Sequence, residues 1–324
     1  MKKTALITGI TGQDGMYLAQ FLIEKDYRVV GIVRSTGENN YSGFEYLKIS
    51  KQIIFENCDL HDITQIISLF KKYQPDEVYN LAAQSSVGQS FSQPIGTIQF
   101  NIISVLNLLE AIKIIGYPTR FYQASSSEMY GKVDTLPIRE NTPMHPLSPY
   151  AVSKASSHWI TTNYREAYNL FTCCGILFNH ESFLRKSSFF VKKIITEAID
   201  IKYNKKEKLF VGNINLKRDF GFAPKYVEAM WLMMQQKSPS DYLICSGESV
   251  SLKYIIEYIF ERLGLSMNCI EVSPSLLRPT EIEDIYGDNT KAKSKLGWEY
   301  DYRFSQVLDI LLEEELKYQK RPRK

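Results

Sequence analysis

The chain has 324 residues, of which 44% are hydrophobic, and its formal net charge is +3 at pH 7. This length allows one large domain or two coupled ones, and the small charge argues against a nucleic-acid partner. Neither the five cysteines nor the four histidines have metal-ligand spacing, and no run approaches 18 apolar residues. We therefore expect reduced thiols, a cytoplasmic protein, no metal site and no membrane-spanning helix.

The first predicted unit consists of a strand, a glycine-rich turn and a helix. A short apolar run at residues 4–8 predicts a buried strand, and a helix is expected over residues 16–26. The sequence GITGQDG lies between them. This order is typical of a dinucleotide site, in which the pyrophosphate meets the N-terminus of the helix. We therefore expect Gly9, Gly12 and Gly15, with Gln13 and Asp14 between them, to bind a cofactor.

The second strand, expected at residues 28–33, ends in a sequence that indicates the kind of cofactor. An NAD site usually carries an acidic residue there, which binds the ribose 2′-hydroxyl, whereas an Arg suits a 2′-phosphate. Here the strand is followed by Arg34 and Ser35, with no carboxylate. The alternative interpretation is an Arg in a solvated loop. We expect NADP as the cofactor, with both residues at its 2′-phosphate.

Strands and helices alternate as far as residue 178. Strands are predicted at 53–58, 77–81, 120–124 and 171–178, and helices at 63–73, 100–115 and 148–169. This alternation predicts an α/β fold with a Rossmann-type, doubly wound parallel sheet. The helix at 100–115 is apolar nearly all round, so we expect it to be buried on more than one side, in part by a partner subunit.

Two short stretches at strand ends are further candidates for cofactor binding. Asp59 and Leu60 close the third strand, and the sequence NLAAQS follows the fourth. Its small residues would let the backbone lie beside a flat cofactor. We therefore add Leu81, Ala82 and Ala83 to the candidate cofactor residues.

The regular alternation ends after residue 179. The stretch NHESFLRKSS is polar and expected to be irregular, and no helix or strand is predicted for the later motif KRDFGFA. Helices are predicted at 189–202, 226–236, 252–264 and 305–319, with a short one before LGW, and strands near 209–212 and 242–245. We expect residues 179–324 to form a smaller α/β domain over the strand ends of residues 1–178. Some of its elements should return to the first sheet.

The stretch from residue 124 to residue 154 carries the candidate catalytic groups. Tyr150 and Lys154 are four residues apart, so a helix places both side chains on one face. A Lys ammonium beside a Tyr hydroxyl favours the phenolate, although bringing a pKa of ~10 to neutrality takes about 3 units, or ~4 kcal/mol. A bound nicotinamide cation would contribute to that shift. Ser126 and Glu128 are expected at the C-terminal end of a strand, where catalytic groups lie in open α/β sheets.

An ordered set of motifs resembles the extended short-chain dehydrogenase/reductases, and more narrowly the GDP-mannose 4,6-dehydratase family. The motifs are TGITGQDG, NLAAQS, ASSSEMYGK, SPYAVSK, GILFNHES, KRDFGFA and RPTE, and the similarity covers residues 3–316. The resemblance implies a Rossmann domain (1–178) that binds NADP, a nucleotide-sugar domain (179–324), and a homodimer or homotetramer. It also implies a lyase that converts a GDP-hexose to the GDP-4-keto-6-deoxy sugar plus water.

The same resemblance implies roles for individual residues. Tyr150 and Lys154 match the YxxxK pair of the family, Ser126 matches its catalytic Thr or Ser, and Glu128 matches the acid/base Glu that epimerases of similar architecture lack. Cofactor positions are matched by Gly9, Gly12, Gly15, Arg34, Ser35, Asp59 and Leu60. Substrate contacts are matched by Asn179, Arg218, Arg278 and Glu281, and we add Ser85 and Lys192 to these candidates.

Two departures from the family pattern concern the sugar. The family has SPRRG after NHE, where this chain has SFLRK at 182–186, and the family's insertion before RPT is missing. The sugar therefore stays open between mannose, N-acetylglucosamine and a heptose. Three alternatives also remain: a GDP-sugar epimerase or 4-keto reductase, a UDP- or dTDP-sugar 4,6-dehydratase, and an NADP-binding sensor or scaffold without turnover.

Overall fold

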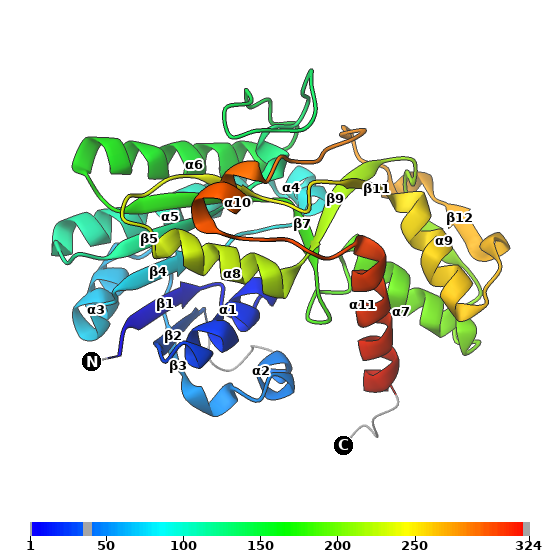
Figure 1. The fold of residues 1–324 in the computed structure, drawn as a ribbon, viewed down its shortest axis with the longest axis horizontal. Helices are drawn as coiled ribbons and strands as arrows, with labels where there is room; N and C mark the ends of the chain where they lie inside the picture. The colour runs from blue at the N-terminus through cyan, green and yellow to red at the C-terminus, as the bar shows by residue number, and fades with distance from the viewer. Residues whose placement is uncertain (1, 35–40, 320–324) are drawn as a thin grey trace.

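The computed structural model describes residues 2–34 and 41–319 (Figure 1). Among these residues, seven strands form a central sheet in which every neighbouring pair is parallel. In spatial order the strands are β10 (Tyr242–Ile244), β6 (Thr172–Leu177), β5 (Arg120–Ser126), β4 (Glu77–Asn80), β1 (Thr4–Thr8), β2 (Arg28–Val33) and β3 (Ile53–Asn57). The strand order reverses between β1 and β4, as in a Rossmann fold, and this confirms the predicted fold class.

Helices cover both faces of the sheet, because its buried strands direct apolar side chains to both sides. In β1, Ala5 and Ile7 belong to one core and Leu6 belongs to another. Helices α1 and α8 pack on the first side, and α3 and α5 pack on the second. The covering helices are α1 (Gln13–Glu24), α3 (Ile63–Tyr73), α5 (Pro94–Ile115), α6 (Pro149–Tyr168), α8 (Ala223–Met234) and α10 (Thr290–Leu296).

Helix α5 is the most apolar of these helices. By length and composition alone it is long enough to cross a membrane, the one such helix within the described ranges. It packs against α3 and α6, and it buries Val105, Leu108 and Ile112 in the core on that face of the sheet. The helix begins at Pro94 rather than at the expected residue 100, because a proline is tolerated in the first turn, where its missing N–H has no helical partner.

Two small sheets lie at one end of the main sheet (Figure 1). Helices α7 (Phe190–Lys202), α9 (Leu252–Leu263) and α11 (Phe304–Gln319) pack there around a core of their own, which includes Ile194, Ile255 and Leu308. The strands are β11 (Ser249–Ser251), β9 (Lys217–Phe222) and β7 (Asn179–Glu181) in one sheet, and β12 (Ile270–Val272) and β8 (Leu209–Val211) in the other. The remaining short helices are α2 (Ser42–Tyr46), α4 (Val87–Ser92), and the 3-10 turns Ser50–Gln52, Ser127–Met129, Met267–Cys269 and Pro274–Leu276.

The second half of the chain differs most from the sequence expectation. The motif KRDFGF, for which no helix or strand is predicted, forms strand β9. The motif NHE, which is expected to be irregular, forms strand β7. These strands pair residues far apart in sequence, such as Asn179 with Phe220, so their polar local sequences do not reveal them. Strand β10 pairs with β6 at the edge of the main sheet, and α8 packs against α1.

Candidate active site

The loop between β1 and α1 is shaped by its glycines. Gly9 has a φ of +66°, and a Cβ there would lie 2.7 Å from the backbone nitrogen of Ala82. At Gly15 a Cβ would lie 2.5 Å from Cα of Ile10, so neither position accepts a side chain. Helix α1 then begins at Gln13, and no side chain of the described residues caps its N-terminus. Its first N–H groups are therefore available to an anion.

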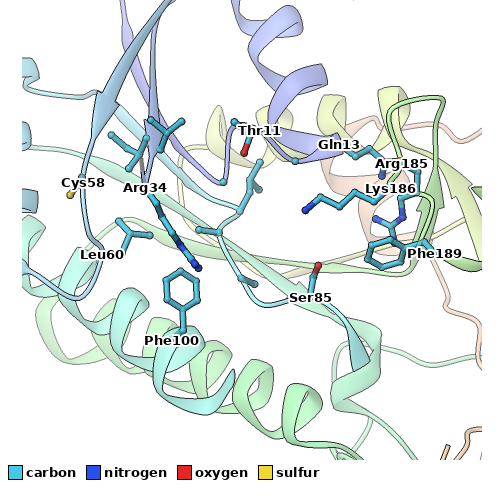
Figure 2. A pocket seen from close by; sticks show the side chains of 17 residues that line it. Thr11, Gln13, Arg34, Cys58, Leu60, Ser85, Phe100, Arg185, Lys186 and Phe189 are labelled. Atoms are coloured by element: carbon cyan, nitrogen blue, oxygen red, sulfur yellow. The ribbon is translucent and has the colours of Figure 1, made fainter. Parts of the chain in front are cut away.

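A first cavity, of about 400 Å³, opens over this glycine turn. Figure 2 shows Arg34, Leu60 and Phe100 toward one end of it, and Arg185 and Lys186 toward the other. The Arg34 guanidinium lies 4.5 Å from the centre of the Phe100 ring. The predicted cofactor residues that line the first cavity are Gly9, Gly12, Gln13, Arg34, Leu60, Leu81, Ala82 and Ala83.

The lining of the first cavity fits a dinucleotide that carries several phosphates. Three cationic side chains line it, those of Arg34, Arg185 and Lys186, and none of its described lining residues carries a carboxylate. Aliphatic side chains of Ile32 and Val33 suit an adenine ring. The cations, the glycine turn and the uncapped helix N-terminus together provide the donors that phosphate groups require.

A second cavity, of about 330 Å³, adjoins the first and shares Ser85 and Arg185 with it. It is lined by all four predicted catalytic residues: Ser126, Glu128, Tyr150 and Lys154. The predicted substrate residues that line it are Ser85, Asn179, Arg218, Arg278 and Glu281. The structure thus brings together side chains from β5, α6, β7, β9 and the RPTE segment, which are far apart in sequence.

Strand β5 and the turn after it position Ser126 and Glu128. The strand extends to Ser126, two residues beyond its expected end at residue 124. The Ser126 hydroxyl oxygen then accepts a hydrogen bond from the backbone N–H of Glu128, at 3.3 Å. This bond caps the short turn in which Glu128 lies and holds the backbone of both residues at the edge of the second cavity.

Tyr150 and Lys154 share one face of α6, but their electrostatics differ from the expectation. Lys154 Nζ donates a hydrogen bond to the carbonyl of Ala124 at 2.7 Å and lies 5.9 Å from the centre of the Tyr150 ring. Burial raises the pKa of Tyr150 to about 12, although a hydrogen bond with Ser126 acts to lower it. Burial also lowers the pKa of Lys154 to about 8. For the polypeptide by itself, desolvation dominates at both side chains, so the pKa of Tyr150 does not move toward neutrality.

Asp14, predicted to contact the cofactor, is bonded to His180. Both of its carboxylate oxygens lie 2.9 Å from Nε2 of His180, whose Nδ1 lies 2.7 Å from the carbonyl oxygen of Phe178. Both ring nitrogens thus face oxygen atoms of the protein. Burial acts to raise the pKa of Asp14, but the charge and hydrogen bond of His180 bring it down to about 2. The pair connects α1 to β7 beside the second cavity.

Several predicted residues lie outside the described lining of both cavities. The Lys192 ammonium pairs with Glu315 and donates to the carbonyl of Phe183 at 2.8 Å. The Asp59 carboxylate accepts the N–H of His61 at 2.9 Å within its own turn. Gly15 is buried under the glycine turn. Ser35 lies outside the described residues.

Sequence reasoning missed Arg185, which lines both cavities. Phe183 and Leu184, which precede it, depart from the family pattern, but their side chains do not line either cavity. The Phe183 ring packs against those of Tyr46 and Tyr318, with centroids 4.7 and 5.3 Å apart, and Leu184 joins the core on the α1 side of the sheet. The departure at SFLRK therefore puts its apolar side chains away from the cavities. The one available signal was the basic pair at residues 185 and 186 in a polar stretch.

Comparison with known proteins identifies the relatives of this chain. The family model described as GDP-mannose 4,6 dehydratase matches residues 6–311. The chain is 42% identical to GDP-mannose 4,6 dehydratase 1 of Arabidopsis thaliana over 331 residues, which cover 99% of this chain and 91% of that one. It is 40% identical to the GDP-mannose 4,6-dehydratase of Yersinia enterocolitica, with 91% and 89% covered.

Solved structures show the same fold at lower identity. The dTDP-glucose 4,6-dehydratase of Streptomyces venezuelae, solved with NAD and TYD bound, has a TM-score of 0.88 at 19% identity and covers 98% of each chain. The RMD of Pseudomonas aeruginosa, complexed with NADPH, has a TM-score of 0.82 at 24% identity, with 98% and 100% covered. These likenesses concern the fold alone.

Proposed function

Because the chain belongs to the GDP-mannose 4,6-dehydratase family, we propose that its first cavity holds the cofactor and its second holds a GDP-hexose. The protein is a nucleotide-sugar 4,6-dehydratase, a hydro-lyase that removes water from a GDP-hexose. The observation that carries the assignment of residues is that Ser126, Glu128, Tyr150 and Lys154 line one cavity, which adjoins the glycine turn. The carboxylate beside the Tyr and Lys favours dehydration over epimerisation or simple reduction.

The proposed cofactor is NADP. Arg34, held against Phe100, would bind the 2′-phosphate, and the absence of carboxylates from the described lining of the first cavity argues against an NAD-type ribose site. The N-terminus of α1 and its glycine turn would hold the pyrophosphate. When bound, the nicotinamide ring supplies a reversible hydride acceptor for C4 of the sugar and a positive charge that favours the Tyr150 phenolate.

Tyr150 and Glu128 carry out the proton transfers in this proposal, and Ser126 helps to hold the substrate. Tyr150 takes the proton of the sugar 4-hydroxyl, and Ser126, which shares a hydrogen bond with it, holds the same oxygen. The carbonyl formed at C4 makes the C5 proton acidic. Glu128 takes that proton and protonates the departing C6 hydroxyl, which leaves as water. This elimination leaves a double bond between C5 and C6. The hydride taken from C4 would return to C6, and a proton equivalent to the one taken by Tyr150 would add at C5. The product is then a GDP-4-keto-6-deoxy sugar with no net oxidation or reduction.

In this proposal, Arg218 and Arg278 bind the nucleotide end of the substrate. Arg218 lines the second cavity, and its Nη1 is fixed by bonds to the carbonyls of Lys217 and Ile282, at 2.7 and 2.6 Å. In this proposal, the remaining N–H groups of its guanidinium bind the diphosphate. Arg278 lines the same cavity from an exposed segment and would contribute a second cation.

Replacing Glu128 by Gln separates the two halves of this mechanism. We expect Glu128→Gln to slow water loss from the GDP-hexose by ~10²–10⁴-fold, the usual contribution of one acid/base group. Oxidation at C4 should persist in this variant, visible as absorbance of reduced cofactor on the enzyme. Tyr150→Phe is the comparator, and it should lose both signals. Near-normal water loss by Glu128→Gln, read by mass spectrometry, would show that the carboxylate has another role.

We further propose a homodimer that works in the cytoplasm. Helices α5 and α6 pack against each other and expose large apolar side chains. The exposed fractions are 72% for Ile95, 58% for Ile114 and 59% for Trp159. An exposed apolar surface spread over two adjacent helices is typical of a subunit interface, and pairing of two such helix pairs would cover it. A tetramer built from such dimers is the alternative.

A further inference from the structure

Glu181 is a buried carboxylate at the second cavity that the proposed reaction does not use. It is the last residue of β7, its side chain is 3% exposed, and it lines the cavity. Its Oε1 lies 3.8 Å from Nε of Arg185, which is beyond hydrogen-bonding distance. Its Oε2 is buried and has no hydrogen-bond partner among the described residues. Because buried polar atoms are nearly always satisfied, this oxygen calls for a partner that the cavity admits.

The surroundings of Glu181 keep the carboxylate in place for such a partner. Side chains alternate along a strand, so Asn179 and Glu181 share one side of β7, and both line the second cavity. His180, between them, is held by Asp14 and the Phe178 carbonyl. Burial raises the pKa of Glu181, and Arg185, His180 and Lys192 oppose this rise, while Asp14 adds to it.

We propose that Glu181 binds the hexose of the GDP-sugar, by accepting a hydrogen bond on Oε2 from the 2- or 3-hydroxyl. This inference rests on the proposed function and deepens it. In that mechanism C1 carries the diphosphate, and C4, C5 and C6 face Tyr150 and Glu128, so the 2- and 3-positions remain without a partner. The 2-position distinguishes mannose from N-acetylglucosamine, which makes Glu181 a residue that sets sugar specificity.

Direct binding tests this role without relying on turnover. In the NADP-loaded Tyr150→Phe protein, which should not turn over, the affinities for GDP, GDP-mannose and GDP-N-acetylglucosamine are measured by calorimetry. The tighter of the two sugars serves as the probe. A second substitution in this protein, Glu181→Leu, removes both carboxylate oxygens and puts an apolar side chain of similar size in their place. We expect it to weaken binding of the probe by about 10- to 100-fold and to change GDP binding by less than about twofold, since a hydrogen bond to a charged group is lost. Glu181→Gln, which keeps one acceptor, should be intermediate.

Glu315→Leu is the matched control, because Glu315 is another buried carboxylate, paired with Lys192 and outside the described cavity linings. It should leave the ratio of probe affinity to GDP affinity unchanged. Three results would overturn the proposal: an unchanged ratio in Glu181→Leu, an equal weakening of GDP and probe, or neither sugar binding more tightly than GDP to the parent. Failure of the proposed function is separate, because it appears as absence of water loss with the unmodified enzyme.

Discussion

Arg34 is the residue on which cofactor choice depends in this account. Its guanidinium is held against Phe100 in a cavity whose described lining has no carboxylate. Arg34→Ala removes the charge proposed to face the 2′-phosphate and leaves the Phe100 ring in place. We expect NADP⁺ to bind about 10- to 100-fold more weakly, because charge-assisted hydrogen bonds are lost, and NAD⁺ to bind nearly as before. Titration of the protein with each dinucleotide measures both values.

Arg139→Ala is a suitable control for this measurement, since Arg139 is mostly exposed and pairs with Asp288 outside the described cavity linings. It should change neither affinity. Equal weakening of NADP⁺ and NAD⁺ binding by Arg34→Ala would contradict the proposed contact with the 2′-phosphate. It would indicate that Arg34 acts on a part that both dinucleotides share.

The sequence was informative about individual residues where a motif fixes both residue type and spacing. The spacing of Tyr150 and Lys154, and the strand-end position of Ser126 and Glu128, sufficed to predict that these side chains meet at one cavity. The protonation behaviour of Tyr150 was not predictable, because its pKa depends on burial by residues that are distant in sequence. The ion pair of Lys192 was not predictable for a similar reason, since its partner Glu315 lies on another helix.

The connection between α1 and β7 depends on one ion pair and two uncharged hydrogen bonds. Asp14 binds His180, Gln13 Nε2 donates to the carbonyl of His180 at 3.1 Å, and the Ser182 hydroxyl donates to Gln13 at 2.7 Å. These contacts hold the glycine-turn helix against the strand that carries Asn179.

Asp14→Asn should weaken this connection and reveal its pH dependence. The folded-state pKa of Asp14 is about 2, below its usual value of 3.8, so the carboxylate stabilises the fold fully above 3.8. That stabilisation is lost as the pH falls from 3.8 toward about 2. We expect the variant to lower the free energy of unfolding by about 1–3 kcal/mol at neutral pH, measured by denaturant titration. The difference from the parent should shrink in acid.

Asp288→Asn is the control, because it removes a carboxylate whose ion-pair partner is more exposed to solvent than His180 is. Asp288 pairs with Arg139, whose side chain is 66% exposed, so we expect a smaller change in the free energy of unfolding at neutral pH. The free energy of unfolding of Asp14→Asn is compared with that of the parent at each pH. If the difference between them stays constant from neutral pH into acid, the ion pair of Asp14 with His180 does not stabilise the fold.

Elements were predictable where local signals suffice. Helix α3 has the expected bounds, because Asp62 caps its N-terminus and Gln74 ends it in a left-handed conformation. Strands β7 and β9 were not predictable, since each is short and polar and becomes a strand only by pairing with a distant segment. The neighbours that Glu181 and Arg218 meet are fixed by these pairings. The part of the site that meets the sugar was therefore less visible in the sequence than the part that meets the cofactor.

At the scale of the whole molecule, helices α5 and α6 expose several large apolar residues to solvent, and one of them is Trp159, which is 59% exposed. Trp159→Glu would place a charge in the proposed dimer interface. We expect the parent to be a dimer or tetramer by light scattering and the variant to move toward the monomer, since burying an unpaired charge is costly. Tyr254→Glu, on α9 and 41% exposed, is the matched control and should leave the mass unchanged. A monomeric parent would contradict the proposed interface.

Removal of water from a GDP-hexose is the central claim, and one measurement tests it most directly. The purified protein, with no added cofactor, is incubated separately with GDP-mannose, GDP-N-acetylglucosamine, a GDP-heptose, UDP-N-acetylglucosamine and dTDP-glucose, and each product is read by mass spectrometry. We predict loss of one water from a GDP-sugar and not from the UDP- or dTDP-sugar, with a cofactor that stays bound through turnover. Absence of water loss from every GDP-sugar, even with NADP⁺ supplied, would contradict the account.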